Sequence, residues 1–394
     1  MRFAAPSPAN DDKGGPAATV AGCCFPGMSE TIETDSRPVL TIDLGVVVEN
    51  WRKLAAMAKG AEPAAAVKAN AYGLGMEPVA RALAASGART FFVATPEEGV
   101  ALRRSLPAAD IYILNGLPLG TAPLFLAHRL RPALKSLLDL SNWAASGQGQ
   151  PAALHIDSGL NRLGLGPDEV AAVAAQPALL TGINLTLVMS HLIVSEEQDN
   201  PLNRQQLANF KSAVQQLGLT AKPQSLAASS GIFLGPDFHL QMVRPGASIY
   251  GLNPLINQPN PMRQAVRLEG KILQTRHVDA GMSVGYGATH LVRKPGRIAT
   301  VGIGYADGFM RRLGNRAFVF IGEQRIPIVG RVSMDLITLD VSALGEDAAK
   351  PGTIVQVLGP KQTPDELATF AETNGYEILT SLGPRYRRVY VGGA

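Results

Sequence analysis

The alternation of short apolar runs with amphipathic stretches between residues 64 and 244 is the feature that most constrains the fold. Strands buried in a parallel sheet read as continuous apolar runs, whereas the helices that cover them show helical spacing. The pattern predicts helices that include residues 76–86, 96–106, 167–175 and 203–217. It predicts eight strands, at Ala64–Lys68, Thr90–Ala94, Ile111–Asn115, Pro132–Lys135, Ala153–Asp157, Leu185–Ser190, Gln224–Ala228 and Leu240–Arg244. Eight evenly spaced strand–helix repeats favour an α/β fold with a closed (β/α)8 barrel. An open doubly wound sheet is the alternative, but such a sheet usually has fewer strand–helix repeats.

The predicted helix at 96–106 has a clear start signal. Thr95 offers a capping hydroxyl, Pro96 stands at the first helical position, and Glu98 follows three residues after the cap.

Two regions flank the repeats. Upstream, Val39–Leu44 alternates as a strand does, and residues 45–58 carry a helical pattern. Downstream, a cluster of Pro and Asn near residue 260 precedes β-type runs at Ile298–Val301, Ala317–Ile321, Ile326–Val329, Leu336–Val341 and Ile354–Leu358, with Gly322-Glu323-Gln324 as a hairpin loop. We therefore expect a disordered tail at 1–37, the barrel at 38–258 and a smaller, mainly-β domain at 259–394.

The composition argues against several classes of protein. A net charge of +4 without any block of like charge gives little support to nucleic-acid binding. No window approaches 18 consecutive apolar residues, so no membrane span is predicted. The two cysteines, Cys23 and Cys24, are adjacent, and the histidines lack an H-E-x-x-H pattern, so we expect neither a disulfide framework nor a metal site.

The N-terminal residues are broken by Pro, Gly and Asp, which predicts the disordered tail. Residues 20–23 resemble a lipoprotein processing box, but Asp11, Asp12 and Lys13 stand where a signal peptide needs its apolar core. We therefore expect a cytoplasmic protein, with Met28 as an alternative start codon.

Lys68 ends the first apolar run and precedes a loop that contains Tyr72, Gly73 and Gly75. At the mouth of a buried strand, desolvation lowers the pKa of a lysine and leaves free amine near neutral pH. A Schiff-base nucleophile or a proton-abstracting base needs that free amine. The alternative is an ordinary strand-end lysine that reaches into water, which spacing alone does not exclude.

Functional groups of a barrel lie just past the C-terminal ends of its strands. At those ends stand Asn161, Arg162, His191, Ser229, Ser230, Gly231, Arg244, Pro245 and Gly246. The small-residue turns after strands seven and eight suit a phosphate. Taken singly, each residue also has an ordinary structural role as an alternative: Ser230 could cap a helix, His191 could be a core histidine, and Arg244 could pair with a structural carboxylate. Together with Lys68 they predict a pyridoxal phosphate site.

The ordered motifs resemble those of the alanine racemase family, the fold type III pyridoxal phosphate enzymes. The resemblance rests on Ala65–Gly75, Ser158–Gly164, Met189–His191, Val243–Gly246, Ile249–Gly251, Val284–Thr289, Gly304–Gly308 and Gly330–Asp335. It implies a (β/α)8 barrel followed by a β domain, in a homodimer.

The resemblance also implies residue roles. Lys68 would bind the cofactor and act as base on one face of the substrate Cα, and Tyr286 of a partner subunit would act on the opposite face. The implied cofactor contacts are Lys68, Tyr72, Arg162, His191, Ser229, Ser230, Arg244 and Gly246. The implied substrate contacts are Arg162 and Met334, the latter through its backbone. Arg244 would face the pyridine nitrogen and disfavour its protonation.

Two departures from the family pattern bear on the site. His155 stands where many members carry a lysine that becomes carbamylated and orients the arginine, so Arg162 needs another acceptor, such as Asp157, a water or a chloride. Ser229 stands in place of an asparagine that contacts the cofactor, and its side chain is shorter.

The resemblance implies an isomerase, an alanine racemase that interconverts L- and D-alanine and supplies D-alanine for peptidoglycan. A racemase of wider specificity, for serine or longer side chains, is the nearest alternative. A related decarboxylase would carry a carboxylate where Arg244 stands, and a non-catalytic pyridoxal phosphate-binding protein would lack the β domain. A phosphate-binding barrel without pyridoxal is the remaining alternative.

Overall fold

The chain divides into a unit of residues 1–36 and a unit of residues 37–394. The computed structural model describes residues 36–393. The predicted tail up to residue 35, with Cys23, Cys24 and Met28, lies outside the described residues.

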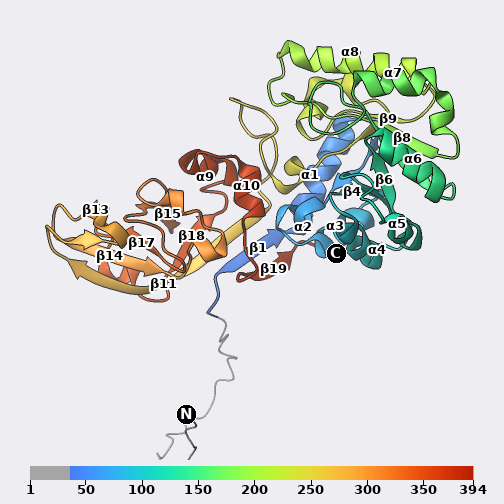
Figure 1. The fold of residues 1–394 in the computed structure, drawn as a ribbon. Helices are drawn as coiled ribbons and strands as arrows, with labels where there is room; N and C mark the ends of the chain where they lie inside the picture. Colours follow the sequence, from blue (N-terminus) through green and yellow to red (C-terminus); the bar gives the residue numbers. More distant parts are fainter. Residues whose placement is uncertain (1–35, 394) are drawn as a thin grey trace, which may run out of the picture. The chain divides into compact units, whose positions relative to one another are not determined.

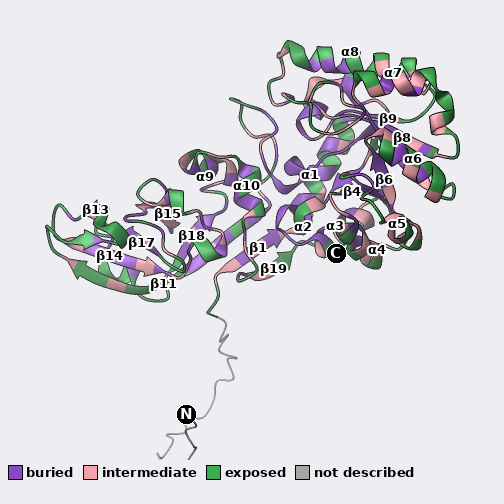
Figure 2. Ribbon diagram, in the orientation of Figure 1, coloured by how far each residue is buried: buried purple, intermediate pink, exposed green. Residues whose placement is uncertain are grey.

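A parallel sheet forms the interior of the first domain. Its order is β3 (Ala65–Ala66), β4 (Thr90–Val93), β5 (Asp110–Ile113), β6 (Arg131–Leu134), β7 (Pro151–His155), β8 (Asn184–Met189) and β9 (Gln224–Ser225). Each strand lies within one of the predicted apolar runs or overlaps it. The strands are buried along most of their length, while the covering helices expose their outer sides (Figure 2).

The sheet closes through an eighth strand position. Strand β2 (Glu62–Pro63) directly precedes β3 and pairs in parallel with β10 (Met242–Val243). The backbone of Ala64 donates to the carbonyl of Val243 at 2.9 Å, and the backbone of Arg244 donates to that of Ala227 at 2.9 Å. The predicted barrel is therefore confirmed, and the open-sheet alternative is wrong.

Helices follow the strands as the alternation predicts (Figure 1). They are α3 (Met76–Ala85), α4 (Pro96–Ser105), α5 (Ala122–His128), α6 (Leu137–Ser146), α7 (Pro167–Ala175) and α8 (Pro201–Gln216). Helix α4 begins as predicted, because Thr95 and Glu98 form a reciprocal capping box. Helix α1 (Leu44–Met57) packs against the short helix η4 (Ala247–Tyr250), where the Asn50 amide donates to the carbonyl of Ile249.

The second domain is built on an eight-stranded sheet. Six strands follow one another in the order β16 (Gln324–Pro327), β15 (Phe318–Ile321), β18 (Ile354–Leu358), β11 (Val266–Val278), β1 (Val39–Asp43) and β19 (Arg387–Val391). The long strand β11 also pairs with β14 (Gly296–Val301), and β14 pairs with β17 (Ile337–Asp340). A small hairpin of β12 (Ser283–Val284) and β13 (His290–Leu291) and the helices α9 (Pro364–Ala371) and α10 (Gly375–Thr380) complete it. The predicted hairpin loop joins β15 to β16 through Gly322 and Glu323.

Strand β1 differs from the expected domain assignment. The sequence pattern places it at the start of the barrel region at 38–258, but it pairs antiparallel with β11 and parallel with β19 in the sheet of the second domain (Figure 1). The alternation of buried and half-buried residues in β1 fits either location, which is why the sequence could not assign it.

Among residues 36–393, no helix combines the length and the apolar character that crossing a membrane requires.

Candidate active site

A cavity of about 700 Å³ lies at the C-terminal ends of the barrel strands. All eight predicted cofactor contacts line this cavity. The predicted residues that line it are Lys68, Tyr72, Arg162, His191, Ser229, Ser230, Arg244 and Gly246. Residues from loops that are up to 178 positions apart in the sequence (Lys68 to Gly246) therefore share one space.

Lys68 stands where β3 gives way to a left-handed turn. The four residues after it, Ala69 to Tyr72, have φ values of +53°, +54°, +53° and +55°. The left-handed conformation costs an L-residue roughly 1–2 kcal/mol. The turn therefore has to be held by contacts from elsewhere in the fold.

Strand β19 of the second domain supplies two of those contacts. The Arg388 guanidinium donates to the carbonyl of Gly73 at 3.0 Å, and the Tyr390 hydroxyl donates to the carbonyl of Leu74 at 3.0 Å. The second domain thus supports the backbone that carries Lys68.

The electrostatic surroundings of Lys68 favour its neutral amine. Burial lowers the pKa of Lys68, the positive charge of Arg162 lowers it further, and the carboxylate of Glu98 opposes both effects. The sequence-based expectation of a lysine with a lowered pKa agrees with these surroundings.

Arg244 is only 5% exposed and follows β10 at the base of the cavity. Its guanidinium donates to the carbonyl of Ser190 at 2.6 Å and to the Ser225 hydroxyl, and lies 5.8 Å from the Phe92 ring centroid. Burial lowers the pKa of Arg244 to about 10, which still leaves it charged at neutral pH. No described carboxylate pairs with it, so the alternative of a structural ion pair is wrong for this part of the chain.

Gly246 and Tyr72 lie against each other at one side of the cavity. A Cβ on Gly246 would lie 2.6 Å from the Tyr72 hydroxyl and 3.1 Å from the Cβ of Ala66, so any side chain there would have to displace Tyr72. The Ser229 hydroxyl accepts from the backbone N–H groups of Gly246 at 3.0 Å and Ser248 at 3.2 Å. Ser229 therefore joins the turns after β9 and β10 and still has its own proton to donate.

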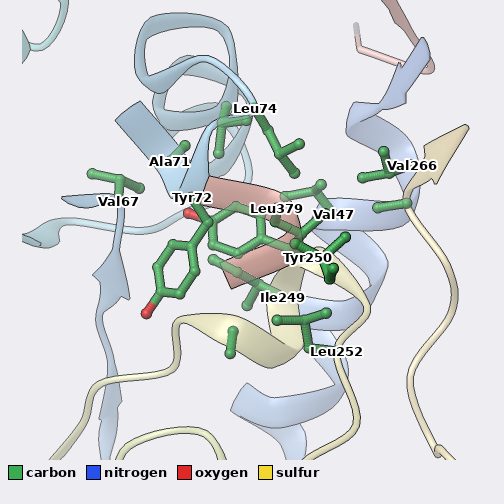
Figure 3. Packing of buried hydrophobic residues seen from close by; sticks show 14 of the residues in the cluster. Val47, Val67, Ala71, Tyr72, Leu74, Ile249, Tyr250, Leu252, Val266 and Leu379 are labelled. Carbon is green, nitrogen blue, oxygen red and sulfur yellow. The ribbon is translucent and has the colours of Figure 1, made fainter. Parts of the chain in front are cut away.

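Aromatic packing fixes Tyr72. Its ring centroid lies 4.8 Å from that of Tyr250, whose hydroxyl donates to the carbonyl of Ala66 at 2.9 Å (Figure 3). Burial raises the pKa of Tyr72, so its hydroxyl stays protonated. It is a hydrogen-bond donor at the cavity wall.

Two neutral histidines line the same cavity. Burial, followed by the positive charge of Arg244, lowers the pKa of His191 to about 3 and that of His155 to about 4. The His155 Nδ1 atom is buried and has no hydrogen-bond partner among residues 36–393. A buried polar atom without a partner fits a site that is completed by another group.

Arg162 forms no hydrogen bond or ion pair with any residue that the structure describes. Asp157, one of its expected acceptors, instead accepts from the backbone N–H groups of Gly159 at 2.8 Å and Leu160 at 2.9 Å. Asp157 therefore shapes the loop that carries Arg162 and does not pair with it.

Tyr286 and Met334 do not line the cavity. Tyr286 is 72% exposed, on a turn between β12 and β13 that Gly285 and Gly287 form with φ values of +78° and +72°. Met334 is 54% exposed, and its carbonyl accepts from the backbone of Ala306 at 2.9 Å. Its backbone N–H finds no acceptor among the described residues.

Comparisons with known proteins agree with this fold and site. The family description "Alanine racemase, N-terminal domain" matches residues 42–254, and "Alanine racemase, C-terminal domain" matches residues 265–390. The chain belongs to the alanine racemase family. A curated "Alanine racemase" of Rhodospirillum rubrum is 47% identical over 91% of this chain and 97% of its own length. An "Alanine racemase, catabolic" of Mesorhizobium japonicum is 46% identical over 92% of this chain and 95% of its own length.

A solved structure, "Crystal structure of alanine racemase from Bartonella henselae with covalently bound pyridoxal phosphate", is also similar. It is 38% identical, covers 91% of this chain and 100% of its own, and has a TM-score of 0.87. The alanine racemase family depends on pyridoxal phosphate, so the predicted family, enzyme class and cofactor are confirmed at this level.

The cavity of this member of the alanine racemase family fits that cofactor. Three basic residues, Lys68, Arg162 and Arg244, line the cavity, and Glu196 is the single acidic residue among its lining residues. This excess of positive charge suits an anionic phosphate. The unpaired His155 Nδ1 is consistent with a bound group. The described residues place no three His, Cys, Asp or Glu side chains together as metal ligands.

Tyr376 also lines the cavity, although no motif in the sequence marks it. It belongs to α10, and its ring centroid lies 6.1 Å from that of Tyr72. The signal that could have revealed this helix is Asn374, whose side chain caps α10 by accepting from the backbone of Glu377.

Proposed function

We propose that the chain interconverts L-alanine and D-alanine with pyridoxal phosphate bound covalently to Lys68. The observation that carries the proposal is the cavity that joins a lysine of lowered pKa to a buried arginine without a carboxylate partner. When bound, the cofactor withdraws electrons from the substrate Cα and makes its proton removable. Each remaining role belongs to the side chains of the chain itself.

Lys68 takes or returns the Cα proton on one face of the substrate. Burial favours its neutral amine, which is the form that accepts a proton. Arg244 keeps a fixed positive charge beside the cavity, because its guanidinium is held by Ser190 and Ser225. A neighbouring guanidinium disfavours protonation of a ring nitrogen placed against it.

The phosphate lies, in this proposal, at the turns after β9 and β10. The Tyr72 hydroxyl, the hydroxyls of Ser229 and Ser230 and the backbone near Gly246 meet there. The neutral imidazole of His191 contributes no charge to this end of the cavity. Arg162, free of protein partners among the described residues, is available for the cofactor or the substrate carboxylate.

The second proton donor and acceptor comes, in this proposal, from a partner subunit of a homodimer. Tyr286 and Met334 are exposed and lie outside the cavity of their own chain. Four further apolar or aromatic side chains of the same domain are also exposed, namely Met282, Leu291, Tyr305 and Leu336. The backbone N–H of Met334, which has no acceptor among the described residues, is suited to a carboxylate of the substrate in the partner's site.

We place this activity in the cytoplasm, as a supply of D-alanine for peptidoglycan. The domain boundaries at 37/38 and 258/259 are likewise part of the proposal, except that β1 (Val39–Asp43) pairs within the sheet of the second domain. Wider substrate specificity is the second candidate within the same site chemistry. Racemisation of a panel of L-amino acids, read by chiral separation, decides it: conversion confined to alanine supports the proposal.

The decisive experiment is Lys68→Ala. We expect the full-length variant to lose the visible absorbance of the bound cofactor and all measurable racemisation, because no other lysine lines the cavity in residues 36–393. Circular dichroism checks that the variant is folded. Retention of the absorbance band by a folded Lys68→Ala variant would falsify the assignment.

A further inference from the structure

Glu98 connects two parts of the barrel through one carboxylate. Its Oε2 atom accepts from the backbone N–H of Ala94 at 2.8 Å and of Thr95 at 3.4 Å, at the start of α4. Its Oε1 atom accepts from the backbone N–H of Ala69 at 2.6 Å. Capping α4 requires only the first set of contacts, so the contact with Ala69 needs a separate explanation.

Ala69 directly follows Lys68 and opens the left-handed turn. The second residue of the turn, Asn70, is tied to the start of α3, because its side-chain oxygen accepts from the backbone of Met76 at 2.8 Å. Glu98 holds the end nearest Lys68. The direction in which the Lys68 side chain leaves the backbone therefore depends on this carboxylate.

We propose that Glu98 is a positioning residue for Lys68: it fixes the strained turn after Lys68 and supplies a negative charge that acts on the Lys68 amine. The inference rests on the proposed role of Lys68 and extends it to a residue on a neighbouring helix. Glu98 does not line the cavity, so it acts through Lys68 and not on the substrate.

The charged and titratable groups that act on Lys68 come from several elements. Arg162 follows β7, His191 follows β8, and Glu98 belongs to α4. Arg162 lowers the pKa of Lys68, His191 is neutral, and Glu98 alone raises the pKa. Removal of the Glu98 charge should therefore lower the pKa of Lys68 further and weaken the hold on its backbone.

The test compares Glu98→Gln with a matched control, Glu366→Gln. Thr363, Pro364 and Glu366 form the same capping box at α9, where Glu366 contacts only its own box. Both variants lose a capping-box carboxylate, and only Glu98→Gln also removes the charge beside Lys68. Full-length apoenzyme is mixed with pyridoxal phosphate, and the rate of covalent capture is followed by absorbance across pH.

We expect the pH at which the capture rate reaches half its plateau value to fall by about 0.5 pH unit or more in Glu98→Gln. This shift is smaller than the one that removing the partner of a direct ion pair would cause. The plateau rate should also fall by roughly threefold or more, because the amine is less well oriented. Glu366→Gln should match the parent in both quantities.

Equal midpoints and plateau rates in Glu98→Gln and the parent would overturn the proposal. If both variants lose similar thermal stability and leave the midpoint unchanged, Glu98 is only a helix cap and the proposal fails. Should Glu98→Gln not fold, Glu98→Asp keeps the charge and shortens the reach: a parental midpoint with a lowered plateau rate supports the inference, and a parental plateau rate contradicts it. Capture by Lys68→Ala would instead contradict the proposed function, so the two failures are distinguishable.

Discussion

A single missing methyl group at Gly246 lets the Tyr72 hydroxyl reach the cavity. The alanine Cβ would lie 2.6 Å from that hydroxyl, well inside normal contact distance. We expect Gly246→Ala to lower the free energy of unfolding by about 1–3 kcal/mol, as overpacking does, and to weaken cofactor binding. Urea denaturation and cofactor titration measure the two effects.

Tyr72→Phe provides the control for this prediction. Without the hydroxyl, the nearest ring atom to the new Cβ is 3.3 Å away, so most of the clash disappears. In a double-mutant cycle, Gly246→Ala should cost clearly less stability in the Tyr72→Phe background. Equal costs in both backgrounds would show that the hydroxyl is not what excludes a side chain.

His155 makes the stability of the fold depend on pH. Burial lowers its pKa to about 4, below the value of about 6.5 in an unfolded chain. Between these values the unfolded state binds more protons, so stability is complete above pH 6.5 and is lost as the pH falls toward 4. From pH 7 to pH 5 we expect a loss of about 2 kcal/mol from this residue.

Urea denaturation at the two pH values tests this expectation. His155→Gln, which cannot titrate, should lose about 2 kcal/mol less than the parent over that interval. A parallel pH dependence in the two proteins would mean that His155 is not the titrating group, and the similarly buried His191 would become the first candidate.

Local chemistry made some residues of the site predictable. The strand-end position made Lys68 a candidate for desolvation but did not exclude an ordinary lysine, and its selection came from the barrel, which places Arg244 and His191 at the same end. Tyr376 could not be predicted, because it reaches the cavity from a helix of the second domain that no motif marks. The orientation of Arg162 also escaped prediction, because Asp157 satisfies the backbone of its own loop first.

Among the elements, α1 is tied to the barrel by Asn50, which is 2% exposed. Its amide donates to the carbonyls of Ile249 at 3.3 Å and Arg263 at 2.8 Å, and its oxygen accepts from the Arg263 N–H at 2.9 Å. Asn50→Ala leaves these buried groups unpaired, so we expect a loss of about 2–4 kcal/mol in urea denaturation.

The exposed Asn184 provides a control of the same residue type, with a single hydrogen bond to the carbonyl of Gly149. Asn184→Ala should cost less than about 0.5 kcal/mol. Similar losses in both variants would contradict the role assigned to Asn50.

The barrel strands were predictable because strands covered on both faces are continuous apolar runs between helical patterns. Strand β11 was missed, although Val266, Leu268 and Ile272 are buried and alternate with exposed Arg267 and Lys271. Period-two alternation identifies a strand but not its neighbour. For that reason the partners of β1 became visible only in the structure.

At the scale of the whole molecule, two complementary variants test whether subunits share sites. Tyr286→Phe alone should reduce racemisation by at least roughly 100-fold with the cofactor retained, as expected for loss of an acid–base group. Lys68→Ala alone should be inactive. A hybrid dimer of the two would contain one site with both residues intact.

After dissociation and random reassociation of an equal mixture, about a quarter of the parental activity should return. Chiral analysis of alanine measures the recovery, and each variant treated alone is the control. No recovery despite hybrid formation, verified by mass spectrometry of differently sized subunits, would place Tyr286 in the site of its own chain.

The position of β1 has a consequence for chimeric proteins. Because this strand precedes the barrel in the chain but lies between β11 and β19 in the other sheet, a crossover near residue 258 divides one sheet between two parents. A chimera that exchanges the C-terminal half should therefore carry residues 39–43 with it. Recombination between relatives is best designed with three segments, of which the first and the third come from the same parent.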